Sequence, residues 1–352
     1  MDKKRIVARV FLTPLASLYR AITAIRNVLY DRRWFTSYTS ALPVISVGNL
    51  TVGGNGKTPL CLYLIGELQA RGWKPVILSR GYGGTHTGPY LVRQDDSPCT
   101  VGDEPLLMAR AIGAPVVISR ARVEGARFIE REKIGDVIVL DDGFQHRRLR
   151  RDLDIVSMFA GTEEAIDSFA QGEILPLGRF REDRDAGLRR ASLLVVSERS
   201  VLPEVAELRA LDERIQRIVP SRVPMFRAYY EFVEVRTLTG EQVPTPRIIH
   251  GFAGIANPQG FFDSLGRVGF TVQRTHQFPD HHPFTEDEVA ALIKNNPGTL
   301  FVCTEKDAVK LREMSERIRS CFAEFRVRLK VFPSDALMVA VERALQKSSS
   351  RP

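Results

Sequence analysis

One short stretch constrains the fold of this chain most strongly, because it joins an apolar strand, a glycine-rich loop and a helix in immediate succession. Residues 44–58 read VISVGNLTVGGNGKT. Glycines let backbone N–H groups curve around phosphate oxygens, and the helix N-terminus adds partial positive charge. The stretch predicts a phosphate-binding loop of the P-loop type, formed by Thr51, Gly53, Gly54, Asn55, Gly56, Lys57 and Thr58.

Two side chains of this loop have a predicted chemical role. Lys57 is placed to reach the β- and γ-phosphates of a nucleotide, and the hydroxyl of Thr58 is placed to bind Mg²⁺. The strict pattern G-x-x-x-x-G-K-[ST] is broken at its first glycine, where this chain has Thr51. A related variant loop has a basic residue where this chain has Val52. We therefore expect arginines elsewhere to neutralise the phosphates.

An acidic pair supplies the expected second half of a nucleotide site. Asp141 and Asp142 directly follow the apolar run Val137–Leu140. A carboxylate at the carboxyl edge of a parallel sheet can hold Mg²⁺ directly or through water. Either aspartate of the pair could contact the metal.

Alternation of apolar runs and amphipathic segments predicts the architecture. From residue 43 onward short strands alternate with helices, which is the pattern of a mostly parallel sheet covered on both faces. A break near residues 219–224 precedes a second alternating block. We predict an α/β fold with a P-loop NTPase-like core and a smaller second α/β domain, divided as 1–33, 34–224 and 225–352. If the last strand, Phe325–Val331, pairs with Phe226–Val235, the final helix returns to the core.

Positive charge is concentrated at the N-terminus. Residues 1–33 contain eight lysines and arginines and two aspartates, so they hold six of the eight net positive charges of the 352-residue chain. A general nucleic-acid-binding surface is therefore a poor interpretation. We expect the main helix to begin at Thr13-Pro14 and to lie in a membrane interface, with Arg9 and Arg20 on its polar face. One apolar stripe of this helix runs along Phe11, Leu15, Leu18, Ile22, Ile25 and Leu29.

Composition excludes several other classes of protein. Hydrophobic residues make up 44% and charged residues 26%, as in ordinary globular proteins. No apolar run is long enough for a standard transmembrane helix. The four cysteines are far apart and form no CxxC pair, which argues against a disulfide framework or a zinc site.

Nucleotide binding leaves a GTPase switch, an ATP-driven machine or a kinase for a small acceptor. A guanine-specific N/T-K-x-D motif is missing, since the nearest string is TEKD at 304–307. A kinase needs a base for the acceptor hydroxyl and cations for the phosphoryl group. Candidates for these roles stand in glycine-bounded or strand-end clusters, among them Arg80, Asp103, Arg120, Arg122, His146, Arg181, Glu182 and His281.

Seven strings, taken in order, resemble one known family. They are GNLTVGGNGKTP (48–59), SRGYGG (79–84), GDEP (102–105), LDDGFQHRR (140–148), LGRFRE (177–182), FPDH (278–281) and TEKD (304–307). Together they look like the tetraacyldisaccharide 4′-kinases, the lipid A 4′-kinases. The strings lie between residues 48 and 307, and the likeness extends over most of the chain. The departure at Thr51 is also usual in this family.

The resemblance implies a reaction, its cofactors and a location. The γ-phosphate of ATP, with Mg²⁺, would pass to the 4′-hydroxyl of a tetraacyl glucosamine disaccharide 1-phosphate to form lipid IVA. The enzyme would act at the cytoplasmic face of the inner membrane of a Gram-negative-type bacterium. A lipid-anchored substrate fits the basic amphipathic N-terminus, so we expect membrane surface and lipid as partners, no nucleic acid, and a monomer.

The resemblance also leads to a predicted role for each candidate residue. Asp103 is expected to be the base or orienting group for the acceptor hydroxyl, paired with His281. Closure between the two domains is expected to complete the site. Lys57, Arg122 and Arg181 are expected to stabilise the transferring phosphoryl group, with Arg120 as the alternative to Arg122. The predicted metal ligands are Thr58, Asp141, Asp142 and Glu182, and the predicted substrate contacts are Arg80 and His146.

Two other functions remain open on the sequence alone. A membrane-peripheral P-loop ATPase, acting as a switch or metallochaperone, would share the loop, Mg²⁺ and the N-terminal helix without needing Asp103 or His281. A lipid-binding scaffold would leave the phosphate loop unexplained.

Overall fold

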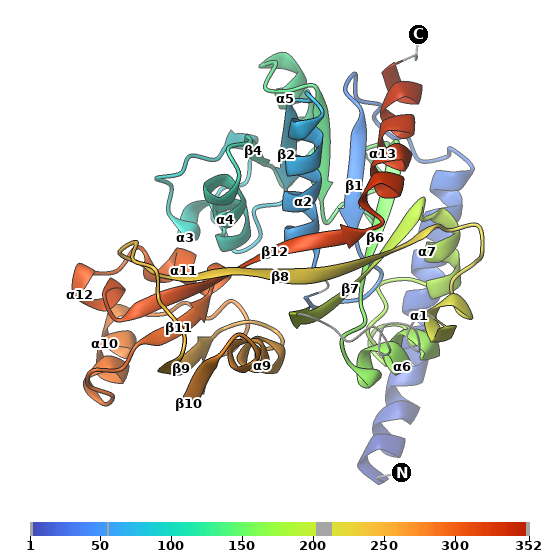
Figure 1. Ribbon diagram of the computed structural model, residues 1–352. Coiled ribbons are helices and arrows are strands. Elements are labelled where there is room, and N and C mark those ends of the chain that lie inside the picture. Colours follow the sequence, from blue (N-terminus) through green and yellow to red (C-terminus); the bar gives the residue numbers. More distant parts are fainter. Residues whose placement is uncertain (1–2, 55, 202–212, 350–352) are drawn as a thin grey trace.

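A single twelve-stranded sheet organises the described residues, which are 3–54, 56–201 and 213–349 of this computed structural model (Figure 1). The strand order is β10-β9-β11-β12-β8-β7-β6-β1-β5-β2-β4-β3. The elements of the first part are α1 Lys3–Asp31, β1 Val44–Gly48, α2 Lys57–Ala70, β2 Pro75–Ser79, β3 Tyr90–Leu91, α3 Pro98–Val101, α4 Asp103–Ala111, β4 Val116–Ile118, α5 Arg122–Arg131, β5 Val137–Asp141, β6 Leu153–Phe159, α6 Glu163–Gln171, α7 Arg184–Arg190 and β7 Leu193–Val201.

The strands from β7 to β4 pair in parallel, and only the short β3 at the edge runs antiparallel to its neighbour. Strands β1, β2, β4 and β5 are buried along their whole length, as their apolar runs predict. Parallel strands place all their carboxyl ends at one edge of a sheet. The loops that follow β1, β2 and β5 therefore meet there, and these loops contain most of the candidate residues.

The second part continues the same sheet. Its elements are β8 Met225–Thr237, β9 Arg247–Ala253, α9 Gln259–Arg267, β10 Phe270–Gln277, α10 Glu286–Lys294, β11 Phe301–Thr304, α11 Glu305–Leu311, α12 Glu316–Arg319, β12 Phe322–Phe332 and α13 Ser334–Ser349. The long strands β8 and β12 pair antiparallel and cross the molecule between its two parts (Figure 1). Strand β8 also pairs in parallel with β7, so the predicted boundary at residue 224 falls between hydrogen-bonded neighbours.

Hydrophobic clusters show how the two parts are joined. Phenylalanines and aliphatic residues of β9, α9 and β11 form a core of their own in the second part. The last helix behaves differently, because Leu337, Val341 and Leu345 of α13 pack in one cluster with Leu60 and Leu64 of α2. The chain thus returns to its first part after β12. The division into two domains stays a prediction.

Helix α1 starts earlier than the sequence pattern predicts. It begins at Lys3, and Pro14 lies inside it, so a start at Thr13-Pro14 is wrong. The Thr13 hydroxyl donates to the carbonyl of Arg9 one turn earlier, as in a helix interior, and does not cap a new helix. Figure 1 shows the N-terminal turns of α1 projecting beyond the rest of the fold. Among the described residues no helix is both long and apolar enough to span a bilayer.

Candidate functional site

The phosphate loop connects β1 to α2 and is shaped by glycines. Gly53 and Gly56 have φ angles of 104° and 74°, values that favour glycine. The loop lies against the segment 179–181, with Val52 N donating to the carbonyl of residue 179 at 2.8 Å and the backbone N–H of residue 181 donating to the Leu50 carbonyl at 2.8 Å. Thr51 forms an isolated β-bridge with Phe180. Of the predicted loop residues, Asn55 lies outside the described ranges.

Two of the three predicted cations, Lys57 and Arg181, meet at Asp142, directly after β5. The Lys57 ammonium lies 3.5 Å from Asp142 Oδ1, and Arg181 Nη1 donates to both carboxylate oxygens at 3.0 and 3.1 Å. Burial alone would raise the pKa of Asp142, but Lys57 and Arg181 outweigh burial and lower it. The backbone of Asp142 has a φ of 48°, which directs the chain sharply away from the strand. The structure therefore brings Lys57, Asp142 and Arg181 together.

The neighbouring Asp141 has few positive charges around it. Its side chain is buried and accepts a 2.8 Å hydrogen bond from the Ser79 hydroxyl at the end of β2. Burial, followed by the nearby charges of Glu104 and Asp142, raises the pKa of Asp141 to about 6. The Thr58 hydroxyl faces the same group of carboxylates, 3.4 Å from Glu104 Oε2. Glu104 belongs to this site although sequence analysis gave it no role; its GDEP string was the available signal.

Asp103 and His281 meet across the two parts of the sheet. Asp103 begins α4, His281 follows β10, and His281 Nδ1 lies 2.9 Å from Asp103 Oδ2. The pairing expected from the sequence is thus present. His281 has a φ of 61°, which again marks an unusual backbone position.

Two lysines of α11 surround this pair and were missed by sequence analysis. Lys306 Nζ lies 3.0 Å from His281 Nε2 and 3.2 Å from Glu104 Oε1, and Lys310 Nζ lies 3.4 Å from Asp103 Oδ2. A lysine ammonium only donates, so Nε2 of His281 accepts from Lys306 and the protonated Nδ1 donates to Asp103. The TEKD string contains Lys306, but only its place in the fold shows what this lysine contacts.

These neighbours set the ionisation of the pair. Burial would raise the pKa of Asp103, yet the hydrogen bond from His281 and the charges of Lys306 and Lys310 lower it to about 2. The same hydrogen bond raises the pKa of His281, against the opposing effects of burial and of Lys306. Asp103 is therefore a carboxylate throughout the physiological pH range, and the pKa of His281 lies above that of an isolated histidine.

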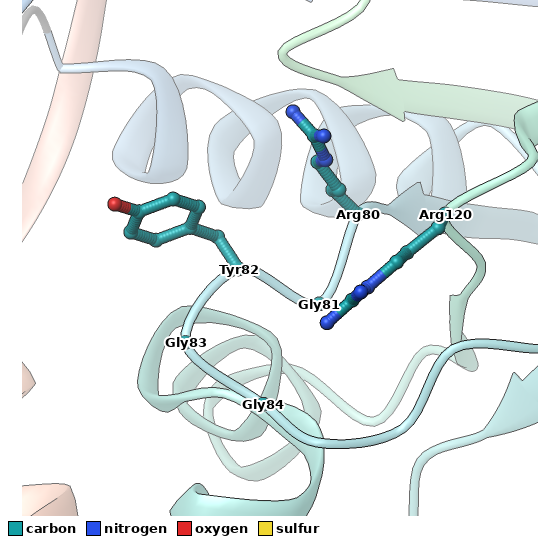
Figure 2. A pocket seen from close by; sticks show the side chains of 6 residues that line it. All are labelled: Arg80, Gly81, Tyr82, Gly83, Gly84 and Arg120. Atoms are coloured by element: carbon teal, nitrogen blue, oxygen red, sulfur yellow. The ribbon is translucent and has the colours of Figure 1, made fainter.

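A pocket opens beside this pair at the SRGYGG loop. Figure 2 shows the Arg120 side chain passing close to Gly81 while the Tyr82 ring points to the other side of the loop. The Tyr82 ring packs edge-on against His281, with 5.6 Å between ring centroids. Two guanidinium groups make this pocket suitable for an anionic ligand. Its volume is about 310 Å³, and its lining consists of Arg80, Gly81, Tyr82, Gly83, Gly84 and Arg120 (Figure 2).

Arg122 and His146 each have a buried nitrogen that lacks a hydrogen-bond partner among the described residues. Arg122 is buried at the start of α5, and its Nε has no hydrogen-bond partner among the described residues. Burial and the charge of Arg80 lower the pKa of this guanidinium. Nε2 of His146 likewise has no hydrogen-bond partner within the described part of the chain. Burial and the nearby charge of Arg122 lower the pKa of His146 to about 4. Buried groups of this kind are expected where a ligand supplies the missing contact.

Glu182 is placed differently from the other predicted metal ligands. It is fully buried, and its oxygens accept hydrogen bonds from Arg190, Asn27 and Gln145. Within the described ranges no three Asp, Glu, His or Cys side chains converge as a metal-binding group. The structure thus does not bring Glu182 into a ligand cluster with Asp141 and Asp142.

Comparison with known proteins gives one consistent family. The model of the tetraacyldisaccharide-1-P 4′-kinase family matches residues 8–346. The tetraacyldisaccharide 4′-kinase of Chlorobaculum parvum is 38% identical over 320 residues, covering 87% of this chain and 85% of the relative. The tetraacyldisaccharide 4′-kinase of Aeromonas salmonicida is 34% identical over 305 residues, covering 86% of this chain and 84% of the relative. The crystal structure of LpxK from Aquifex aeolicus in complex with ATP matches with a TM-score of 0.76 and 30% identity, covering 96% of this chain and 99% of the other.

Proposed function

Because this chain belongs to the tetraacyldisaccharide 4′-kinase family and is an ATP-dependent kinase of lipid A biosynthesis, we propose a division of labour among its residues. The phosphate loop holds ATP, and the Asp103–His281 pair receives the 4′-hydroxyl of the tetraacyl disaccharide 1-phosphate. The observation that supports this most is the 2.9 Å contact between Asp103 and His281. Glu104, next to Asp103 in the chain, in turn faces Thr58 of the phosphate loop.

Phosphoryl transfer proceeds by attack of the 4′-oxygen on the γ-phosphorus as the bond from that phosphorus to the β,γ-bridging oxygen breaks. The 4′-hydroxyl proton passes to Asp103, which the Nδ1–H group of His281 holds in place. Asp103 has a low pKa, so its main contribution is to orient the hydroxyl, and the proton is accepted as the new ester bond forms. ADP and the 4′-phosphorylated lipid are the products.

The charge on the transferring group is met by cations from three separate elements. Lys57 at the start of α2 contacts the γ-phosphate, while Arg181 approaches from the segment after Phe180. Arg122 of α5 offers a buried Nε that no other described residue engages. Such preorganised charges stabilise the phosphoryl group as it separates from ADP.

The lipid head group is assigned to the pocket side of the site. Arg80 lines the pocket of the SRGYGG loop, and its guanidinium suits the 1-phosphate or a sugar hydroxyl of the disaccharide. His146 has a buried ring nitrogen that lacks a partner among the described residues and a pKa of about 4, so it is neutral and can donate or accept a hydrogen bond. We assign both residues to the disaccharide or its 1-phosphate.

The residues around Thr58 suit Mg²⁺. Mg²⁺ prefers oxygen ligands, and the Thr58 hydroxyl, Asp141 and Glu104 offer them in a region short of positive charge, as the raised pKa of Asp141 indicates. Thr58 with Asp141 or Asp142 would hold the ion, and Glu104 replaces Glu182 as the additional ligand. When bound, Mg²⁺ neutralises the β- and γ-phosphate oxygens.

Helix α1 attaches the enzyme to the membrane surface from which it takes its lipid substrate. Phe11, Leu15, Leu18, Ile22 and Ile25 are each more than half exposed along one side of the helix. An apolar face of this kind, together with nearby arginines, favours binding to an anionic interface. We propose the cytoplasmic face of the inner membrane as the location. A monomer suffices, since every residue assigned here comes from one chain.

A transfer assay tests the proposal. Purified protein in detergent micelles receives γ-labelled ATP, Mg²⁺ and the tetraacyl disaccharide 1-phosphate. We expect label in the lipid, and a decrease of about 10²–10⁴-fold in Asp103→Ala. Asp95→Ala, which removes an exposed aspartate outside the site, is the matched control and should keep activity within about twofold.

Two results would overturn parts of the proposal. Lipid labelling that is unchanged in Asp103→Ala would remove Asp103 from the mechanism and leave the kinase intact. Hydrolysis of ATP with well-dispersed but unlabelled lipid would favour a P-loop ATPase switch.

A further inference from the structure

Helix α1 has a second, polar face that points into the protein. Tyr19, Thr23 and Asn27 follow one another at four-residue spacing, so they lie on one side of the helix. Thr23 and Asn27 are buried, in contrast to the exposed apolar residues Ile22 and Ile25. Attachment to a membrane does not require hydrogen-bonding groups on the inner face of a helix, so this face calls for a separate explanation.

Two of these groups contact the segment that contains Arg181 and Glu182. The Tyr19 hydroxyl donates to the Arg181 carbonyl at 2.9 Å, and Asn27 Nδ2 donates to Glu182 Oε2 at 2.9 Å. The backbone of Asn27 is itself fixed, because Arg147 Nη1 donates to its carbonyl at 2.9 Å. The contacts join α1 to a part of the chain that lies far away in sequence.

From this segment two short chains of contacts reach the nucleotide site. Arg181 donates to Asp142, which pairs with Lys57. Glu182 accepts from Gln145 Nε2 at 3.1 Å, and the same amide group donates to the carbonyl of residue 49, next to the phosphate loop, at 2.8 Å. A displacement of α1 relative to the core would therefore act on the guanidinium and the loop that face the γ-phosphate.

We propose that Tyr19 and Asn27 are positioning residues for phosphoryl transfer: through the segment 181–182, the inner face of α1 holds Arg181 and the phosphate loop in their working arrangement. The inference rests on the proposed role of Arg181. It makes α1 a support of the catalytic site as well as a membrane attachment. It also explains the buried Glu182, which Arg190 already neutralises and which Asn27 orients.

The test uses three variants of the full chain. Asn27→Ala and Tyr19→Phe each remove one link, and Thr23→Val is the matched control on the same face. In the contacts of the described residues, the Thr23 hydroxyl bonds only to carbonyls of its own helix, at Tyr19 and Arg20. The measurements are kcat per ATP-binding site, KM for ATP and lipid in mixed micelles, binding to anionic phospholipid vesicles, and the melting temperature.

We expect kcat to fall about tenfold in Asn27→Ala and about threefold in Tyr19→Phe, with vesicle binding and the lipid KM unchanged. Thr23→Val should stay within about twofold of wild type. A loss confined to lipid KM or to vesicle binding would overturn the inference and leave α1 as an anchor alone. Unchanged kcat in both variants would overturn it as well.

Normalising to ATP-binding sites separates positioning from misfolding, because a merely less stable variant keeps its kcat per folded molecule. The conservative variant Tyr19→Phe keeps the aromatic ring, so its kcat tests the inference if Asn27→Ala is poorly folded. Failure of the underlying function has a different signature: in that case the wild-type chain itself would not label the lipid.

Discussion

Asp103 and Asp141 are equally buried, at 5% exposure each, yet their pKa values move in opposite directions. The pKa of Asp103 falls to about 2 and that of Asp141 rises to about 6. Burial raises the pKa of both carboxyl groups, so the difference comes from their neighbours. Asp103 faces one histidine and two lysines, whereas Asp141 faces the carboxylates Glu104 and Asp142 with Lys57 to offset them.

This difference separates two chemical tasks within one site. The region of Asp141 is short of positive charge and suits a divalent cation. The region of Asp103 already holds its cations, which come from α11 in the second part of the chain. In our proposal the first region is completed by a metal ion, and the second is complete only when the two parts of the sheet are in contact. His281→Ala acts on the Asp103 region and Asp141→Asn on the Asp141 region, whereas Lys306 contacts both His281 and Glu104.

The largest effect is expected when the Asp103 region loses its histidine. His281→Ala should lower kcat by about 10²–10³-fold, because Asp103 then lacks the group that we propose to orient it toward the acceptor hydroxyl. The affinity for ATP should hardly change, since the phosphate loop is untouched. Transfer assays and nucleotide titrations measure the two quantities.

His282→Ala provides a matched control for that prediction. His282 is the next residue, and its side chain pairs with Glu288 away from Asp103. The activity of His282→Ala should stay within about twofold of wild type. An equal loss in both variants would mean that the loop as a whole, and not the His281 imidazole, is what matters.

A substitution of Asp141 is expected to change the Mg²⁺ concentration that the enzyme requires. Asp141→Asn should raise the Mg²⁺ concentration needed for half-maximal activity by about 10–100-fold, because a neutral amide would replace the proposed carboxylate ligand. Mg²⁺ titration of the transfer rate measures this. Asp136→Asn changes an aspartate just before the other end of β5, where it accepts from Lys74 N, and should leave the Mg²⁺ requirement unchanged. A similar requirement in all three proteins would contradict a metal at Asp141.

Lys306→Met is expected to have a smaller effect, of about tenfold on kcat at neutral pH. Lys306 lowers the pKa of both His281 and Asp103, so its loss should raise both pKa values. If the reaction needs neutral His281, the acid limb of the kcat profile should move to higher pH. Lys330→Met, which removes a surface lysine paired with Glu231, should leave the profile in place. A profile that does not move in Lys306→Met would exclude Lys306 from the pair's electrostatics.

The last prediction concerns stability without metal, where no effect on activity is involved. The folded-state pKa of Asp141 lies above its ordinary value of 3.8, so the folded chain binds this proton more tightly than the unfolded chain does. Its contribution to the free energy of unfolding therefore decreases as pH rises from about 4 to about 6, by on the order of 2–3 kcal/mol. Urea unfolding with a chelator, compared between wild type and Asp141→Asn, measures the difference. A wild-type curve parallel to that of Asp141→Asn across this window would show that Asp141 is not perturbed.

Much of the fold could be predicted from local patterns. The apolar run Val137–Leu140 lies in β5 and the predicted strand Phe226–Val235 lies within β8, because apolar periodicity and turn residues act over short distances. The predicted start of α1 at Thr13-Pro14 is wrong, because Pro14 lies inside a helix that begins at Lys3. The roles of Glu104 and Lys306 could not be predicted, because neither residue is adjacent in sequence to the groups it contacts across the fold.

The sequence by itself determined the strand–loop–helix unit of the phosphate site, the acidic pair after β5 and the amphipathic character of α1. Each of these depends on residues within a few positions of one another, so periodicity and spacing are enough to specify them. Only the tertiary structure decided that Asp103 is surrounded by cations while Asp141 is not, and that Asn27 reaches Glu182. The physical reason is that electrostatic energy depends on distance in space, and the chain brings these groups together only when the sheet and its helices are assembled.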